Sequence, residues 1–273
     1  MRNNLFLRHA MSTASLTAIT LNLTFWMIPL LLVSVARITL PFAYIRHCCN
    51  MGIEAIYRSA AAFDSWWIKH VLGIHLDIQG ELPRRDRNLI IICNHRSWFD
   101  ILVLHSAIIR HSPIIRFLIK HQLVYVPILG WICLALDFPR LYRAPDPEHR
   151  ARDHRAIADA TSSLNDYPTA LLSFAEGTRY TPEKHKAQQS PWPHLLKPKP
   201  GGLRIMLEHA EDSAILDITL VYPQEDITFW MCLAGTLPYV KVYLDYFEPG
   251  DIEDAAEWLA QRWWVKESLI TGA

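Results

Sequence analysis

The longest apolar stretch of the chain lies near its N-terminus. Between His9 and Arg37 there is no charged residue, and the segment 16–35, LTAITLNLTFWMIPLLLVSV, is about long enough to cross a bilayer core as a helix. Asn22 and Pro29 weaken this pattern without excluding a membrane helix. A secretory signal peptide is the alternative, but the stretch is long and lacks a clear cleavage site. We expect a membrane-associated helix, single-pass or monotopic.

A second helix with two faces follows this stretch. Polar residues recur at every fourth position, and an apolar stripe with the same spacing runs beside them. The polar stripe is Arg46, Asn50, Glu54 and Arg58, and the apolar stripe is Ile45, Cys49, Ile53 and Tyr57. The pattern predicts an amphipathic helix, either on a membrane surface or packed on a domain core. Residues 1–70 are therefore predicted to hold a membrane helix and an amphipathic helix.

From residue 71 onward, short strands alternate with helices. Strand patterns occur at 75–80, 88–93, 169–177, 214–222 and 239–247, and helical patterns at 98–108, 113–121, 128–136, 147–163 and after Gly201-Gly202. This alternation predicts an α/β domain over 71–273, with a central, mostly parallel or mixed sheet flanked by helices. A polar loop is expected from Tyr180 to Pro200, and Asp251 is expected to cap a last helix ending near Ile270.

Composition narrows the possible partners. Lys plus Arg and Asp plus Glu both number 27, so no overall positive charge favours nucleic acid. Hydrophobic residues make up 51% of the chain and ten are Trp, which points toward lipid. Five cysteines, with no zinc-like spacing, predict reduced thiols, with lipidation of Cys48-Cys49 as a minor alternative.

The segment NHRSWFD, residues 94–100, follows the apolar strand NLIIIC and has two interpretations. Ser97 and Asp100 have the spacing of a capping box that starts a helix. His95 falls at the carboxyl end of a buried strand, where open α/β sheets bind ligands. With His95 in the turn and Asp100 in the first helical turn, the side chains can meet, and Asp100 can orient His95 as a general base. The two interpretations are compatible.

Two other chemistries fit this segment less well. His95 and Asp100 supply two metal ligands, and no third or fourth ligand shares a readable spacing, so no metal is expected. Ser97 lacks the glycine-flanked elbow that exposes a nucleophilic serine.

NHRSWFD resembles the first motif, Asn-His-x4-Asp, of the glycerolipid acyltransferases, the family of 1-acylglycerol-3-phosphate acyltransferases. Three further segments resemble the family's motifs in order: LGWICLALDFPRLYR ending in Arg143, FAEGTR with Glu176, Gly177, Thr178 and Arg179, and ILDITLVYP ending in Pro223. The tail WLAQRWWVKESLI resembles the last helix of a branch with lysophosphatidic acid and lysocardiolipin enzymes. The likeness covers about residues 75–225. LVYP stands where Val-Pro-Val is common.

The resemblance implies a membrane-bound enzyme. It would move a fatty acyl group from acyl-CoA or acyl carrier protein to the sn-2 hydroxyl of 1-acyl-sn-glycerol 3-phosphate, with no metal or other cofactor. His95 would deprotonate the acceptor while Asp100 holds His95. Backbone amides of residues 96–98 are candidates for stabilising the oxyanion.

The resemblance also assigns an acceptor site. Arg143 and Arg179 are expected to bind phosphate, Glu176 and Gly177 to shape the site, and Thr178 to cap the turn. Arg140 is a further candidate because the ending FPRLYR departs from the common pattern. Lys197 and Lys199 either meet anionic headgroups or CoA phosphates, or are solvated.

Two alternatives to this activity stay open. One is a lysophospholipid acyltransferase with another acceptor, such as lysocardiolipin or lysophosphatidylglycerol, and the other is an inactive membrane scaffold. The weak bias of basic residues around the apolar stretch favours an active site facing the cytoplasm, at the inner membrane in a bacterium.

Overall fold

A six-stranded mixed sheet forms the centre of the computed structural model, which describes residues 5–40, 42–144, 146–162, 168–210 and 213–272. The strand order is β1-β8-β7-β2-β6-β3, and all neighbours are parallel except β7 and β8. The strands are β1 (His75–Gly80), β2 (Leu89–Cys93), β3 (Ile114–Phe117), β6 (Thr169–Phe174), β7 (Ala214–Val221) and β8 (Tyr239–Phe247). The predicted α/β fold with a mixed sheet is confirmed.

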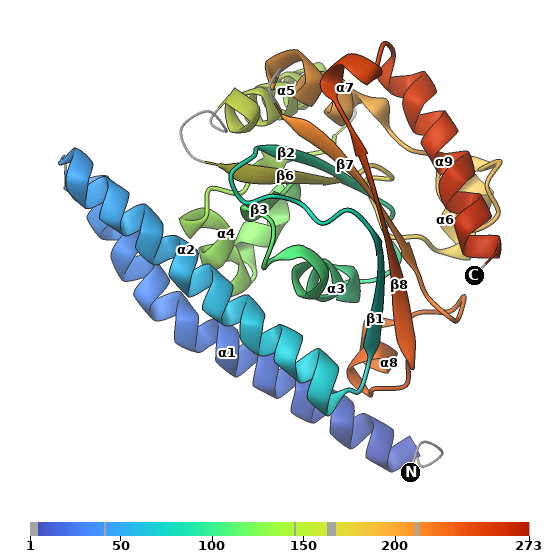
Figure 1. Ribbon diagram of the computed structural model, residues 1–273, viewed down its shortest axis with the longest axis horizontal. Helices are drawn as coiled ribbons and strands as arrows, with labels where there is room; N and C mark the ends of the chain where they lie inside the picture. The colour runs from blue at the N-terminus through green and yellow to red at the C-terminus, as the bar shows by residue number, and fades with distance from the viewer. Residues whose placement is uncertain (1–4, 41, 145, 163–167, 211–212, 273) are drawn as a thin grey trace.

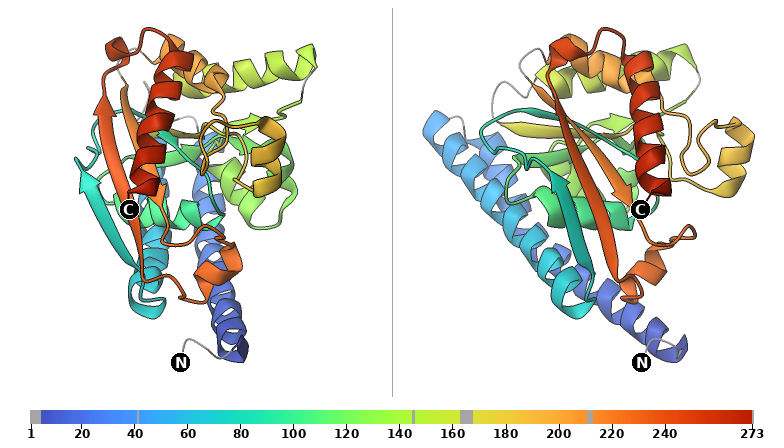
Figure 2. Two further views of the ribbon diagram at one scale, coloured as in Figure 1. Left: turned by 90° about the vertical axis from the view of Figure 1, so that its right-hand side faces the viewer. Right: turned by 45° about the vertical axis from the view of Figure 1, so that its right-hand side comes forward.

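Helices cover both faces of this sheet (Figures 1 and 2). One face packs against α5 (Pro147–Ser162), α7 (Pro200–His209) and α9 (Ala255–Thr271), and the other against α3 (Phe99–Ile108). Side chains of β2 alternate between the two faces, with Ile91 in the α3 core and Ile90 in the α7/α9 core. A strand buried on both faces must be apolar throughout, which explains the run LIIIC.

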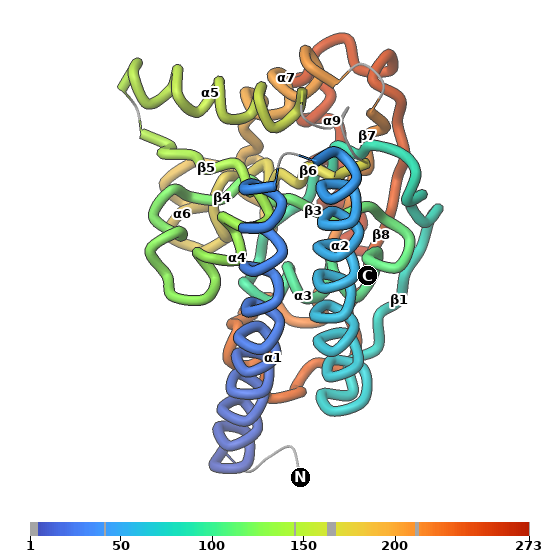
Figure 3. Tube along the Cα trace, turned by 90° about the vertical axis from the view of Figure 1, so that its left-hand side faces the viewer, coloured from blue at the N-terminus to red at the C-terminus, as the bar shows by residue number. Residues whose placement is uncertain are grey.

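The two N-terminal helices, α1 (Leu5–Thr39) and α2 (Ala43–Trp66), lie side by side in opposite directions (Figure 3). α1 also packs on α4 (Leu129–Ala135) and α8 (Phe229–Leu233), and α2 packs on α3. The buried face of α2 carries Cys49, Ile53 and Tyr57, so the predicted apolar stripe faces the protein. Among the described residues, α1 is the one helix long and apolar enough to cross a membrane.

The segment 113–121, predicted as a helix, instead forms strands. Ile114–Phe117 is β3 at the edge of the main sheet, and Ile119–Lys120 is β4, which pairs with β5 (Arg140–Leu141). The β-branched Ile114 and Ile115 favour a strand, and Pro113 is compatible with the start of an edge strand. Periodicity alone does not separate a strand from a helix in so short an apolar segment.

Two predictions in the C-terminal half also need correction. The expected loop 180–200 contains α6 (Pro182–Gln188), which Thr181 caps by accepting a hydrogen bond from Lys184 N. The last helix is capped by Asp254, whereas Asp251 closes a separate 3-10 turn (Pro249–Asp251) by accepting from Glu248 N. The predicted helix 147–163 is α5, and position 163 lies outside the described residues.

Candidate active site

Polar side chains gather at the carboxyl edge of the sheet. His95 follows β2 by two residues, Glu176 follows β6 by two, and Tyr222 comes directly after β7. Strands that run parallel end at the same edge, so residues far apart in the chain meet there. Asn94 fixes this edge, because its Nδ2 donates to Leu220 O at 3.0 Å and its Oδ1 accepts from Leu220 N at 2.8 Å.

His95 and Asp100 form a hydrogen-bonded pair, with 2.7 Å between Nδ1 and Oδ2. α3 starts at Phe99, so His95 lies in the turn and Asp100 in the first turn of the helix, as expected. The His95 ring stacks on Phe174 with 3.9 Å between centroids. The His95 side chain is 12% exposed, and its Nε2 makes no hydrogen bond with any residue the structure describes. This nitrogen is therefore free to meet a substrate hydroxyl.

Asp100 also organises the turn that carries His95. Its Oδ2 accepts from Arg96 N at 2.7 Å and from Ser97 N at 2.9 Å, so the acidic half of the expected capping box is present. Ser97 Oγ is buried and accepts from Phe99 N. The amides of Arg96 and Ser97 are both committed to Asp100, so of the three amides expected to stabilise an oxyanion, that of Trp98 stays a prediction.

Glu176 is fully buried and connects the turn that carries His95 to the segment before α7. Its Oε2 accepts from His95 N and its Oε1 from Leu196 N, each at 2.9 Å. Burial raises the pKa of Glu176 to about 8, while the two backbone hydrogen bonds oppose this rise. Both oxygens are therefore used inside the protein, and these contacts position His95. A direct role of Glu176 toward an acceptor stays a prediction.

The C-terminal helix supports the same segment from the other face of the sheet. Lys266 of α9 is fully buried, with its Nζ 2.7 Å from Asp217 Oδ1 on β7. Oε1 of the next residue, Glu267, lies 2.5 Å from Nδ1 of His194. Arg96 in turn donates to His194 O at 2.9 Å. Thus α9 is linked to the turn that carries His95 through His194.

Arg143 links the end of the segment LGWICLALDFPRLYR to the segment FAEGTR. Its Nη1 donates to Gly177 O and its Nη2 donates to Leu118 O at 2.9 Å. Burial lowers the pKa of Arg143, and the nearby Asp153 carboxylate opposes that effect. Gly177 has a φ of 71°, a conformation that favours glycine. The Arg140 side chain is exposed on β5 and makes no hydrogen bond or ion pair with the described residues, so its role toward phosphate stays a prediction.

Further cations surround the turn 177–179. Lys184 Nζ donates to Thr178 Oγ1 at 2.8 Å, so this hydroxyl meets a lysine. The Lys199 side chain lies over Gly177, where a Cβ would be 3.3 Å from its Nζ. Arg179 is exposed, with its guanidinium carbon 5.1 Å from the centroid of the Trp98 ring. Together with Arg143, these side chains form the cationic cluster, a set of donors suited to phosphate.

Sequence reasoning missed several of these residues. Lys184 lay in a segment expected to be a loop, and Lys199 was left undecided between binding and solvation. No role was assigned to the side chains of Arg96 and Asn94, although both belong to the NHRSWFD segment. Tyr222 was noted only because LVYP stands where the family commonly has Val-Pro-Val.

An apolar cavity of about 170 Å³ lies between α1, α2, α3 and α4. Trp98, which contacts Arg179 of the cationic cluster, lines this cavity. Phe117 also lines the cavity, and its ring centroid lies 6.2 Å from that of Phe174, the residue on which His95 stacks. The cavity therefore approaches the His95 site from the side of the N-terminal helices.

The five cysteines are free thiols, and Cys48 is the exposed one. Burial raises the pKa of both Cys133 and Cys232 to about 12, which keeps these thiols protonated. Within the described ranges, no group of three or more His, Cys, Asp or Glu side chains is arranged to hold a metal ion.

The fold and the site are those of an α/β protein with a histidine–aspartate pair and a cationic turn at the carboxyl edge of its sheet. Residues 75–223 match the Acyltransferase family, more than half of the chain, so the protein belongs to this family.

Named relatives agree with this assignment. The chain is 27% identical over 223 residues to human 1-acyl-sn-glycerol-3-phosphate acyltransferase delta, covering 75% of this chain and 58% of the relative. It is 26% identical over 239 residues to 1-acyl-sn-glycerol-3-phosphate acyltransferase 2 of Brassica napus, covering 80% and 60%. The chain thus spans about three fifths of the length of these relatives.

A solved structure has the same fold. The crystal structure of the 1-acyl-sn-glycerophosphate (LPA) acyltransferase PlsC from Thermotoga maritima superposes with a TM-score of 0.61 at 18% identity, covering 96% of this chain and 92% of that chain.

Proposed function

We propose that the protein transfers a fatty acyl group from an acyl thioester, acyl-CoA or acyl carrier protein, to the sn-2 hydroxyl of 1-acyl-sn-glycerol 3-phosphate, giving phosphatidic acid. The observation that carries this proposal is the free Nε2 of His95, held by Asp100. The names of the relatives support the acceptor, and the cationic cluster supports an anionic headgroup.

The proposed chemistry needs one base and no covalent enzyme intermediate. His95 Nε2 takes the proton of the acceptor hydroxyl as its oxygen attacks the thioester carbonyl. Asp100 stabilises the imidazolium that forms, because its carboxylate is 2.7 Å from Nδ1. The tetrahedral intermediate collapses to the ester, the C–S bond breaks, and the leaving thiolate takes the proton back from His95.

The surroundings of His95 offer separate places for the two ends of the acceptor. The phosphate is assigned to Arg143, Arg179 and Lys199 at the cationic cluster. The apolar cavity can take acyl carbon atoms, since its lining is almost entirely hydrophobic. Trp98 lies between them, lining the cavity and contacting Arg179. An amphiphilic acceptor would thus lie with its hydroxyl region close to His95.

The N-terminal helices supply the proposed membrane contact, with the active site facing the cytoplasm. One face of α1 packs on the domain, while its outer face exposes large apolar side chains. Similar side chains are exposed on α4, which packs on α1. These residues are Phe25, Ile28, Leu32 and Val35 on α1 and Trp131 and Leu134 on α4. Their burial in lipid favours monotopic binding beside the mouth of the apolar cavity.

The test of the activity uses purified protein, acyl-CoA and acyl carrier protein donors, and a panel of lysolipids. His95→Ala should lower the transfer rate by at least about a hundredfold, the usual contribution of a general base. His154→Ala is the matched control, because His154 is exposed on α5. Near-normal activity of His95→Ala would contradict the mechanism. A strong preference for lysocardiolipin or lysophosphatidylglycerol would overturn the acceptor.

Membrane fractionation tests the proposed membrane contact. The protein should stay with membranes after a high-salt wash, because burial of apolar surface does not weaken with ionic strength as surface charge pairs do. Release by high salt alone would contradict insertion of α1 into the bilayer.

A further inference from the structure

Tyr222 reaches the catalytic pair from the end of β7. Its hydroxyl donates to Asp100 Oδ1 at 2.5 Å, across 122 positions of the chain. The other three donors to this carboxylate, from His95, Arg96 and Ser97, all bind Oδ2. Among the described residues, Tyr222 is thus the hydrogen-bond partner of Oδ1. Asp100 is fully buried, so without that partner this oxygen would lose a hydrogen bond that water cannot easily replace.

We propose that Tyr222 is a positioning residue that orients the Asp100 carboxylate toward His95. Its hydrogen bond also weakens the electrostatic stabilisation that this carboxylate gives to the protonated imidazole. This inference rests on the proposed function, because it concerns the same base. The hydrogen bond to Oδ1 fixes the plane of the carboxylate, so that Oδ2 faces Nδ1 of His95. It also spreads negative charge toward Oδ1, and a carboxylate with less charge on Oδ2 stabilises an imidazolium less.

The other charged groups near the pair do not replace this contact. Both oxygens of Glu176 accept backbone N–H groups, and Arg96 donates to the carbonyls of His194 and Glu225. The thiols of Cys93 on β2 and Cys232 on α8 have pKa values raised by burial, so they stay neutral. Lys266 approaches Cys93 from α9 and is paired with Asp217.

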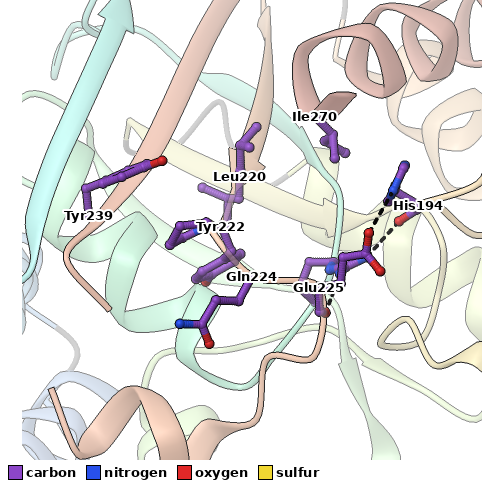
Figure 4. Close-up of a pocket in the computed structure, with 10 residues that line it drawn as sticks. His194, Leu220, Tyr222, Gln224, Glu225, Tyr239 and Ile270 are labelled. Atoms are coloured by element: carbon purple, nitrogen blue, oxygen red, sulfur yellow. Dashed lines mark hydrogen bonds and ion pairs between the residues drawn. The ribbon is translucent and has the colours of Figure 1, made fainter. Parts of the chain in front are cut away.

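Tyr222 also lines a polar cavity of about 210 Å³ on its other side, together with Tyr239 and Gln224 (Figure 4). This gives a matched control at a second tyrosine of the same cavity. Tyr222→Phe removes the hydroxyl next to Asp100, while Tyr239→Phe removes a hydroxyl from the cavity wall at the start of β8. Both changes keep the aromatic ring, so packing is preserved.

The first measurement is the pH profile of acyl transfer with the acceptor that the wild type prefers. Tyr222→Phe should move the acidic limb of kcat/KM upward by about one pH unit and lower kcat by about tenfold near neutral pH, with KM little changed. Tyr239→Phe should leave the limb in place. An unmoved limb in Tyr222→Phe, or a change confined to KM or the melting temperature, would overturn the proposal.

A second measurement needs no acceptor. Carbethoxylation of His95 by diethyl pyrocarbonate, followed by mass spectrometry of its peptide across pH, titrates the imidazole directly, and the exposed His70 serves as internal reference. The His95 midpoint should rise in Tyr222→Phe while that of His70 stays fixed. Equal midpoints in wild type and variant would refute the positioning role. If the wild type does not acylate lysophosphatidic acid but the His95 midpoint still rises in Tyr222→Phe, only the proposed acceptor is refuted.

Discussion

Replacing Asp100 by Asn isolates the charge of the catalytic pair, because the hydrogen bonds can be kept. The Asn Oδ1 can take the place of Oδ2 and accept from the same three donors, while Nδ2 faces the Tyr222 hydroxyl, which can rotate to accept. We therefore expect the free energy of unfolding to change by only about 1 kcal/mol. The lost term is the attraction between the carboxylate and the imidazolium, whose nearest atoms are 2.7 Å apart.

At an effective dielectric constant of about 20, unit charges at this separation attract by roughly 6 kcal/mol, and by about 4 kcal/mol if the imidazolium charge is centred on the ring. Since about 1.4 kcal/mol is a factor of ten, kcat should fall by about a thousandfold or more. Removing the anion also removes its stabilisation of the imidazolium, so the acidic limb of kcat/KM should move down, opposite to its movement in Tyr222→Phe.

Steady-state kinetics across pH, with a thermal melt of each protein, measures these effects. Asp159→Asn makes the same change at an exposed position on α5 and should keep wild-type rates. If Asp100→Asn retains a tenth or more of kcat, the electrostatic account of the pair is wrong. If its activity loss comes with a collapse of the melting temperature, Asp100 acts mainly by holding the turn 95–97 together.

Two further predictions concern stability and the cationic cluster. Burial lowers the pKa of His105 on α3 to about 4, so the unfolded chain binds a proton at His105 before the folded protein does. The free energy of unfolding should therefore fall by about 3 kcal/mol as the pH falls from about 6.5 toward 4. Urea unfolding at several pH values should show a smaller fall in His105→Gln, and an unchanged fall would contradict this prediction. Gly177→Ala should cost about 1 to 2 kcal/mol because φ is 71°, and should raise KM for the acceptor by displacing Lys199. Gly201→Ala, where no atom lies near the new Cβ, is the control that should leave KM unchanged.

Local sequence signals were sufficient for the elements that carry the catalytic pair. LIIIC is apolar at every position and contains three β-branched Ile residues, a pattern that favours a strand buried on both faces, and β2 has that environment. The spacing of His95 and Asp100 allowed a meeting only across a strand-to-helix turn, and α3 starts where this requires. Thr181, Pro182 and Glu183 also formed a readable helix start, so α6 was available to sequence reasoning and was missed.

Other features could not be read from any local pattern. The apolar stripe of α2 fits a membrane or a protein core equally well, and only the packing of α2 on α1 and α3 assigns it to the core. The segment 114–117 became a strand because β6 offered a free edge. The β-branched residues of this segment favour a strand only weakly, so the pairing with β6 decides its conformation.

The sequence by itself determined the class of fold, the pairing of His95 with Asp100 and the family, because these depend on periodicity and on residues close together in the chain. Only the tertiary structure decided that Glu176 accepts from His95 N, that Lys184 and Lys199 lie at the turn 177–179, and that Tyr222 donates to Asp100. The physical reason is the parallel sheet, which brings the ends of β2, β6 and β7 to one edge. Contacts across that edge join Asp100 to Tyr222, 122 positions apart, and Asn94 to Leu220, 126 positions apart, and no spacing along the chain records them.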